Sequence, residues 1–200
     1  MKEETAQTYK LKLVGKREVA RETMEFRFEK PEGFSHAAGQ SMRLKIPGTD
    51  AERTLSIVSA PHESDLLFAV RMRGSEFKKH LKRLSPDEHI VASGPYGTFG
   101  LHEDEKQSTL FIAGGIGITV FISILKHVAQ LELPHPIVLL YSNRNCEDIA
   151  YADELREIER THPNIKVVFV LTKEKPDLWE GELGRINEAM VKKYAPNLMK

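Results

Sequence analysis

The stretch Leu110-Phe-Ile-Ala-Gly114-Gly115-Ile-Gly117-Ile-Thr119 decides how the second half of this chain folds. An apolar, strand-like run leads into a glycine-rich turn, and a helix-like pattern follows the turn. In a strand–loop–helix unit of this kind, the N–H groups of the loop and of the helix N-terminus can hold a phosphate. The alternative interpretation is a glycine turn that serves only tight packing. The stretch therefore predicts an α/β unit with a candidate phosphate site at its turn.

The apolar run from Leu110 to Leu125 could instead be read as a membrane span. It is shorter than the roughly 20 residues that a bilayer requires, and it is interrupted by glycines. A repeat at helical spacing favours a helix over residues 120–131 with one apolar face. That face comprises Val120, Phe121, Ile124, Leu125, Val128 and Leu131. We therefore expect an amphipathic helix here and no transmembrane segment.

Composition excludes several classes of protein. Lys and Arg together number 29, as do Asp and Glu, and this balance argues against a nucleic-acid binder, which normally carries a basic excess. The single cysteine, Cys146, excludes a disulfide framework and a cysteine-ligated iron–sulfur cluster. The histidines show no metal-ligand spacing, so no metal site is expected. The charged N-terminus lacks the apolar stretch of a signal peptide, which predicts a cytoplasmic location.

The first half of the chain is rich in short alternating runs that indicate β-strands. We expect strands at 9–19, 23–28, 41–46, 54–58, 66–72 and 89–92. One helix is expected at 75–84, with Ser75 as its N-cap and with Phe77 and Leu81 facing inward. Short strands separated by Gly, Pro and Asp turns are typical of an antiparallel barrel.

The second half changes to alternating strands and helices. Strands are expected at 110–113, 137–141 and 166–171, and helices at 120–131, 151–160 and 186–193. This alternation is typical of βαβ units and predicts a parallel sheet. The polar stretch 102–108 is the expected junction, so the two domains are predicted at residues 1–102 and 108–200.

Three further motifs bear on chemistry. Arg53-Thr-Leu-Ser56 lies on an expected strand, where the planar fork of an arginine could pair with a pyrophosphate. The run Val70-Arg71-Met72-Arg73-Gly74-Ser75 leads into a helix, and its end forms a second anion cradle. The third motif is the turn Gly94-Pro-Tyr-Gly97-Thr-Phe99.

Together and in this order, the motifs resemble the ferredoxin–NADP reductase superfamily. That family carries R-x-[YF]-[ST], then a Gly-Ser phosphate turn, then G-P-x-G-x-F, and then G-G-x-G-[IV]-[TA]-P. The resemblance implies a β + α/β fold, in which an antiparallel flavin-binding β-barrel precedes a parallel-sheet nucleotide-binding domain. It also implies bound FAD, with NAD(P)H as the electron donor. FAD is favoured over FMN because the Gly74–Ser75 turn suits the second phosphate of a dinucleotide.

The resemblance also assigns roles to residues. Ser56 would act at the flavin ring near N5. Flavin binding falls to Arg53, Thr54, Leu55, Ser56, Val70, Arg71, Met72, Gly74 and Ser75. Binding of the nicotinamide dinucleotide falls to Gly114, Gly115, Gly117, Ile118, Thr119, Ser142 and Arg144. Contacts of Ser142 and Arg144 with a 2′-phosphate would favour NADPH, but a solvated loop charge is an equally open interpretation of Arg144.

Three departures from the family pattern are expected to have consequences. Leu55 replaces the aromatic residue that stacks on the flavin, so the flavin would lose aromatic stacking. Val120 replaces the proline that begins the helix, which softens the helix start. The sequence ends at Lys200, where the family adds a fourth strand and a C-G-P-P type loop, so the strand 110–113 would lie at an edge of the sheet. An open strand edge of this kind invites pairing with another chain. The edge could be covered by a second copy of the chain, by a partner subunit or by a rearrangement of the fold. Alternatively, the sequence is a truncated form of a longer reductase.

The sequence thus predicts an oxidoreductase that passes hydride or electrons between NAD(P)H and a separate acceptor through bound FAD. The acceptor would be another protein or a small molecule. The alternative is an FAD-binding module or subunit whose NAD(P)H reductase activity is lost or depends on a partner. A purely structural interaction domain would leave the ordered motifs unexplained.

Overall fold

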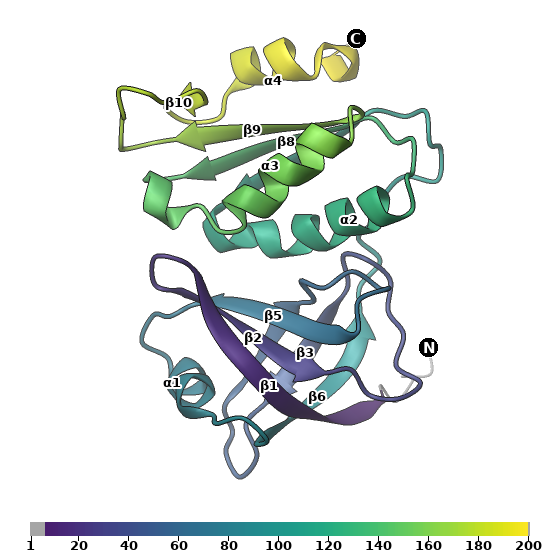
Figure 1. Ribbon diagram of the computed structural model, residues 1–200, viewed down its shortest axis with the longest axis vertical. Helices are drawn as coiled ribbons and strands as arrows, with labels where there is room; N and C mark the ends of the chain where they lie inside the picture. The colour runs from purple at the N-terminus through teal and green to yellow at the C-terminus, as the bar shows by residue number, and fades with distance from the viewer. Residues whose placement is uncertain (1–6, 200) are drawn as a thin grey trace. The chain divides into compact units, whose positions relative to one another are not determined.

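The computed structural model describes residues 7–199. The chain divides between Gly100 and Leu101 into two compact units (Figure 1). The first unit is a curled antiparallel sheet with one helix, and the second is a parallel sheet with helices on both faces. This division matches the expected change from a β-barrel to an α/β unit.

The first unit contains six strands and one helix. The elements are β1 (Thr8–Ala20), β2 (Thr23–Glu29), β3 (Ser41–Lys45), β4 (Glu52–Ser56), β5 (Asp65–Arg71), α1 (Glu76–Arg83) and β6 (His89–Tyr96). The strand order is β4-β3-β6-β1-β2-β5, with antiparallel pairing throughout. The two end strands, β4 and β5, also contact each other, so the sheet closes into a barrel.

The length of β1 lets one strand serve two partners. Its first part pairs with β6 and its second part with β2, with a register shift between Leu13 and Gly15. Such a bulge bends a strand and increases its twist, which suits the wall of a barrel. The interior is filled by alternating apolar side chains of the strands, among them Leu11, Phe26, Phe28 and Phe68.

Helix α1 begins and ends as the sequence predicts. The Ser75 side chain accepts a hydrogen bond from the Lys78 backbone N–H at 3.4 Å, which is the N-cap interaction. Phe77 and Leu81 are buried against the barrel core. The helix therefore starts immediately after β5 and its connecting turn, close to the end of a barrel strand.

The second unit is built around four parallel strands. Its elements are β7 (Thr109–Gly114), η1 (Gly115–Gly117), α2 (Ile118–Gln130), β8 (Ile137–Asn143), η2 (Cys146–Asp148), α3 (Ala152–Thr161), β9 (Ile165–Leu171), β10 (Glu182–Leu183), α4 (Glu188–Tyr194) and η3 (Pro196–Met199). The order is β10-β9-β8-β7, so β7 is an edge strand within the described residues, as expected. The two-residue strand β10 was not predicted.

The sheet of the second unit is covered unequally on its two faces. Helices α2 and α3 lie on one face, where the Phe111 and Phe121 rings are 4.8 Å apart and the Arg156 guanidinium lies over Phe169. On the other face, Met190 of α4 packs against Leu140. On this face, the Ile112 side chain of β7 is 52% exposed, which shows that helix α4 covers β7 only in part.

The prediction for α2 was wrong in two details. The helix begins at Ile118 rather than Val120, because the short 3-10 turn η1 continues directly into it. Its buried face includes Thr119, Ile122 and Ser123, whereas Leu131 is 53% exposed. Leu131 lies beyond the last helical residue, and Glu132 with φ of 51° turns the chain away there.

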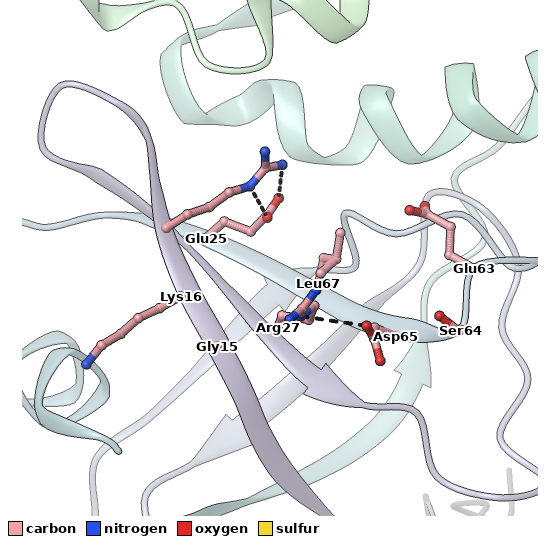
Figure 2. Close-up of a pocket in the computed structure, with 9 residues that line it drawn as sticks. Gly15, Lys16, Glu25, Arg27, Glu63, Ser64, Asp65 and Leu67 are labelled. Carbon is pink, nitrogen blue, oxygen red and sulfur yellow. Dashed lines mark hydrogen bonds and ion pairs between the residues drawn. The ribbon is translucent and has the colours of Figure 1, made fainter. Parts of the chain in front are cut away.

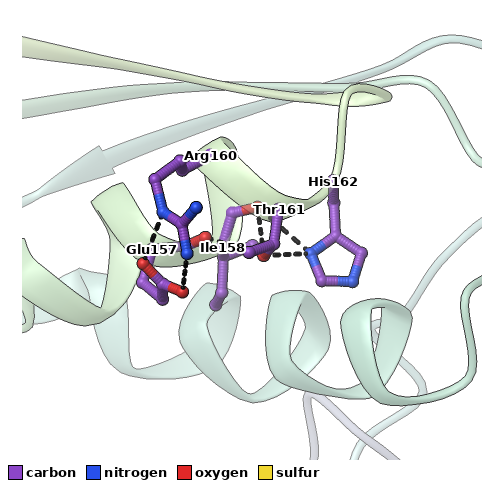
Figure 3. A network of polar contacts seen from close by, with 5 residues as sticks. All are labelled: Glu157, Ile158, Arg160, Thr161 and His162. Carbon is purple, nitrogen blue, oxygen red and sulfur yellow. Dashed lines mark hydrogen bonds and ion pairs between the residues drawn. The ribbon is translucent and has the colours of Figure 1, made fainter.

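The C-terminal end of α3 is fixed by a small polar network (Figure 3). The Arg160 guanidinium donates to both carboxylate oxygens of Glu157, at 2.6 and 2.9 Å, and the Thr161 hydroxyl donates to the Glu157 carbonyl at 2.7 Å. The His162 ring lies 3.1 Å from the carbonyl oxygens of Ile158 and of Ala129 on α2. The network ties the two helices together where β9 begins, which leaves the carboxyl ends of the strands free of it.

Helices of the described residues are all too short or too polar to cross a bilayer.

Candidate functional site

The motif Arg53–Ser56 occupies most of β4, at one end of the barrel sheet. Alternation along the strand places Arg53 and Leu55 on one face and Thr54 and Ser56 on the other. Leu55 is partly buried against the barrel core, and Arg53 is exposed. The Arg53 guanidinium donates one hydrogen bond to the Glu52 carbonyl at 2.7 Å, which leaves most of its five N–H donors for a ligand. Among the described residues, the Ser56 hydroxyl forms no hydrogen bond.

The second flavin motif covers the end of β5 and the turn into α1. Val70 is buried in the core and Met72 packs partly against it, so only their backbone groups could reach a cofactor. Gly74 has φ of 30°, a conformation that residues with a Cβ rarely adopt. The turn lets the chain pass from strand to helix in a few residues and points the N-terminus of α1 outward.

Three cations gather beside this turn: Arg53 from β4, Arg73 from the turn and Lys78 from α1. Partial burial and the positive charges of Arg53 and Arg73 lower the pKa of the Lys78 amino group. Lys78 Nζ donates to the Arg71 carbonyl at 2.6 Å, which holds the ammonium near the turn. Within the described residues, none of the three cations forms an ion pair with a carboxylate.

A flavin dinucleotide fits this arrangement. Its pyrophosphate carries two negative charges, and the turn offers a helix N-terminus together with uncompensated cations. The residues that would hold the pyrophosphate are Arg53, Lys78 and the backbone of Gly74–Ser75. Leu55 and Ser56, which follow Arg53 on the same strand, would lie toward the ring system.

Sequence reasoning missed Arg73 and Lys78 as candidate site residues. A signal was nevertheless present, because Lys78 lies one turn into a helix that follows a Gly-Ser turn. In such a position, a long side chain can curl back over the helix N-terminus. The neighbouring Lys79 looks similar in sequence but is paired with Glu76 at 2.7 Å.

The G-P-x-G turn lies at the end of β6. Gln40 fastens it to the segment before β3, since Gln40 Nε2 donates to the Gly97 carbonyl at 3.0 Å. A Cβ on Gly94 would lie 3.3 Å from the Ser41 carbonyl oxygen, so the close approach of these strands favours glycine. The turn thus holds β3 in place. Because β3 pairs with β4, the turn also fixes the position of Arg53 on β4.

The glycine turn of the second unit is open on its outer side. A Cβ on Gly114, Gly115 or Gly117 would meet no other atom within 4 Å. Gly115 has φ of 50°, which turns the chain from β7 into α2. No side chain caps the start of η1 or of α2, and the Ile118 N–H already donates to the Gly115 carbonyl. An anion would therefore meet the N–H groups at the start of η1. A dinucleotide phosphate therefore fits this turn.

The next two predicted residues point inward. Ile118 is fully buried, and Thr119 is 8% exposed with its hydroxyl donating to the Ile116 carbonyl at 3.0 Å. The Thr119 hydroxyl is thus engaged within the protein. These two side chains shape the start of α2 and are not presented to a ligand, and the Ile118 N–H is itself bonded to the Gly115 carbonyl.

Ser142 and Arg144 lie at the same edge of the sheet as the glycine turn. Gly114 and Ser142 are direct partners in the parallel pairing of β7 and β8. Ser142 is half-buried, and Arg144 follows the strand and is exposed. Behind them, burial raises the pKa of Tyr141 to about 12, so this phenol stays neutral. The structure therefore places Ser142 and Arg144 at the same edge as the glycine turn, whereas the side chains of Ile118 and Thr119 face inward.

A separate cavity of about 620 Å³ opens on strands β1, β2 and β5 of the barrel (Figure 2). Four of its charged side chains form two pairs: Arg17 Nε lies 2.7 Å from Glu25 Oε1, and Arg27 Nε lies 3.7 Å from Asp65 Oδ2. None of the predicted site residues lines it. We therefore assign no cofactor to this cavity.

In the part of the chain that the structure describes, no group of three or more His, Cys, Asp and Glu side chains is placed to hold a metal ion.

Comparison with protein families matches both units. The model of the oxidoreductase FAD-binding domain matches residues 10–101, and that of the oxidoreductase NAD-binding domain matches residues 111–200. The chain is 30% identical over 195 residues to ferredoxin–NADP reductase B of Sorangium cellulosum, covering 94% of this chain and 80% of that protein. It is 30% identical over 131 residues to methane monooxygenase component C of Methylosinus trichosporium, covering 64% of this chain but only 38% of that protein.

The fold has close counterparts among solved structures. A ferredoxin NADP+ reductase from Neisseria gonorrhoeae with bound FAD and NADP superposes with a TM-score of 0.80 at 20% identity. The match covers 96% of this chain and 79% of the Neisseria chain. At this identity the likeness concerns the fold alone.

Proposed function

The chain belongs to the ferredoxin–NADP reductase superfamily, and on this basis we propose that it is an NAD(P)H-dependent flavin oxidoreductase. It passes electrons between NAD(P)H and a separate acceptor through bound FAD. The FAD-binding domain is proposed to span residues 1–102 and the NAD(P)-binding domain residues 108–200.

The observation that carries the proposal is that each unit places the start of a helix directly after a short glycine turn. In the first unit, Arg53 and Arg73 act electrostatically on Lys78 of α1, and none of the three pairs with a carboxylate of the described residues. In the second, an open glycine turn precedes α2. Two dinucleotide sites on one chain are what hydride transfer between a nicotinamide and a flavin requires.

Bound FAD would supply the two-electron and one-electron chemistry that amino-acid side chains lack. The protein's own contribution is to bind and to orient. Arg53 would neutralise the pyrophosphate and the Leu55 side chain would cover a ring face. The Ser56 hydroxyl, which forms no hydrogen bond among the described residues, would be a donor to the ring edge near N5. The glycine turn at 114–117 holds the pyrophosphate of the nicotinamide dinucleotide. Orientation of this kind is effective because the reacting atoms must approach to about 3–3.5 Å.

We propose NADPH as the preferred donor. Ser142 is the direct neighbour of Gly114, and Arg144 lies two residues beyond it. A hydroxyl and an exposed guanidinium beside the dinucleotide turn suit a 2′-phosphate. The preference is measured as the ratio of kcat/KM for NADPH to that for NADH.

The acceptor is proposed to be a separate protein or a small molecule. The relatives named above include a ferredoxin–NADP reductase and a component of a monooxygenase. With one cysteine in the sequence, the chain has too few thiolates to ligate an iron–sulfur cluster of its own. We place the reaction in the cytoplasm, because a chain with a single cysteine needs no oxidising compartment.

We further propose that a second copy of the chain covers the edge of the parallel sheet. Strand β7 pairs only with β8 among the described residues, and half of the Ile112 side chain is exposed. An open apolar strand edge favours pairing with another chain. The measurement is the molar mass in solution.

The experiment that tests the function begins with purified protein saturated with FAD under argon. NADPH or NADH is then added, and the flavin absorbance band is followed. Loss of the band supports the reductase. Retained FAD without loss of the band favours the alternative, an FAD-binding module whose activity is lost or depends on a partner. Failure to take up FAD contradicts both.

A further inference from the structure

Helix α1 carries two adjacent lysines with opposite surroundings. Lys79 Nζ is paired with the Glu76 carboxylate at 2.7 Å, one turn earlier on the exposed side of the helix. Lys78 is half-buried, and its ammonium is held 2.6 Å from the Arg71 carbonyl at the end of β5. Within residues 7–199, Lys79 is therefore paired with a carboxylate and Lys78 is not.

The charges that act on Lys78 are all positive. They come from Arg53 on β4 and from Arg73 in the turn before α1. Neither arginine forms an ion pair with a carboxylate of the described residues, and Lys78 does not either. Like charges held together in this way destabilise the protein unless an anion lies among them.

Lys78 also has donors to spare. An ammonium has three N–H groups, and one of them is used on the Arg71 carbonyl. Arg53 uses one of its five donors on the Glu52 carbonyl. The remaining donors belong to two different elements, α1 and β4, so they suit an anion that extends over more than one phosphate.

We propose that Lys78 is a specificity-determining residue, which binds the second phosphate of the flavin dinucleotide and thereby selects FAD over FMN. The proposal rests on the proposed function, because it assumes that the barrel binds a flavin. It goes beyond the sequence motifs, which assign the phosphates to Arg53, to Arg71 and to the turn at Gly74–Ser75. Arg53 serves the phosphate that both flavins share, and Lys78 serves the phosphate that only FAD has.

The test compares three flavins on the apoprotein of the full chain. FAD, FMN and riboflavin are titrated separately, and each Kd is read from the quenching of flavin fluorescence. The variants are Lys78→Met and, as the matched control, Lys79→Met. Lys78→Arg is included because it keeps the charge, and thermal melting without flavin reports whether each variant is folded.

We expect Lys78→Met to weaken FAD binding by roughly 10- to 100-fold, the loss typical of a charged hydrogen-bond partner. FMN and riboflavin should bind with nearly unchanged Kd. Lys79→Met should leave all three values unchanged, and Lys78→Arg should restore most of the FAD affinity. Added salt should weaken FAD binding more in the wild type than in Lys78→Met.

Three outcomes overturn the proposal. The first is an unchanged Kd for FAD in a folded Lys78→Met protein. The second is an equal loss for FAD and FMN, which would assign Lys78 to the shared phosphate. The third is an equal loss for riboflavin, which would show a structural role. A wild-type protein that binds none of the flavins refutes the proposed function itself, which is a different result from each of these.

Discussion

Gly114 and Ser142 lie directly opposite each other in the parallel pairing of β7 and β8. Gly114 is the last residue of β7 and begins the glycine turn. Ser142 is a polar residue near the carboxyl end of β8. In parallel α/β sheets, ligands bind at the carboxyl ends of the strands, and this pair marks that edge. Arg144 extends the same edge by two residues.

The first prediction concerns this edge. Replacing Arg144 with alanine should lower kcat/KM for NADPH by about 10-fold and leave the value for NADH nearly unchanged, since only NADPH has the 2′-phosphate. Steady-state kinetics with both donors measure the ratio. Arg160→Ala is the control, because Arg160 is exposed and paired with Glu157 on α3. An equal loss with both donors would argue against a role in phosphate recognition.

The second prediction concerns Arg53. Arg53→Ala should weaken FAD binding by about 1.5–3 kcal/mol, because a charged partner of the pyrophosphate is lost. Equilibrium dialysis of the apoprotein with FAD measures the change. Arg43→Ala on the adjacent strand β3 is the control, since Arg43 is also exposed but lies opposite Thr54, on the other face. FAD retention equal to that of the control would contradict the assignment.

The third prediction concerns the leucine that replaces an aromatic residue. Leu55→Tyr should tighten FAD binding by about 0.5–1.5 kcal/mol, the value of an added aromatic pair. The Kd and the quenching of flavin fluorescence on binding both report the new stack. Arg43→Tyr, at an exposed position of the neighbouring strand β3 outside the predicted flavin residues, should give neither effect. If both variants behave alike, Leu55 does not face the flavin.

Local sequence patterns predicted most of the helices and strands, but not all of their boundaries. Period-two alternation predicted the barrel strands, and the Ser75 cap and the apolar residues Phe77 and Leu81 predicted α1. The start of α2 was missed because a 3-10 turn of Gly115–Gly117 leads into the helix without a break. Strand β10 was missed because two residues carry no periodic signal.

The contrast between Lys78 and Lys79 could not be predicted in the same way. Spacing along the helix indicates the pair of Glu76 with Lys79, three residues on, but it carries no information about the cations around Lys78. The difference arises from Arg53, which lies 25 residues earlier in the chain and reaches Lys78 only through the folding of the barrel. Thr119 shows the reverse case, because a residue expected to face phosphate is turned inward by its bond to Ile116.

The fourth prediction is a pH dependence in the second unit. Hydrogen bonds from Lys193 and Tyr194 hold the pKa of Glu182 below its ordinary value of 4.5. The pKa of Glu182 is lower in the folded state than in the unfolded state. The ionised Glu182 side chain therefore raises the free energy of unfolding at pH values above its unfolded-state pKa. This contribution is lost as the pH falls through the folded-state pKa.

Glu182→Gln should therefore lower the free energy of unfolding near neutral pH by about 1 kcal/mol, a modest value because the Lys193 ammonium is largely exposed. The difference between the variant and the wild type should shrink as the pH falls below the ordinary pKa of 4.5. Urea unfolding at a series of pH values measures it. Glu188→Gln, on an exposed pair with Lys192, is the control. A difference that stays constant with pH would contradict the assignment.

The last prediction concerns the open edge of the parallel sheet. Light scattering of the wild type should give twice the mass of one chain, because β7 has no partner on its outer side among the described residues and Ile112 is half exposed. Ile112→Lys should give a monomer, since a charge on an edge strand opposes pairing with another chain.

Leu178→Lys is the control, because Leu178 is 95% exposed on a loop away from β7 and should leave the dimer intact. FAD affinity should stay unchanged in both variants, since the flavin residues belong to the other unit. A wild-type monomer, or dissociation by Leu178→Lys alone, would show that this edge is not the contact between copies.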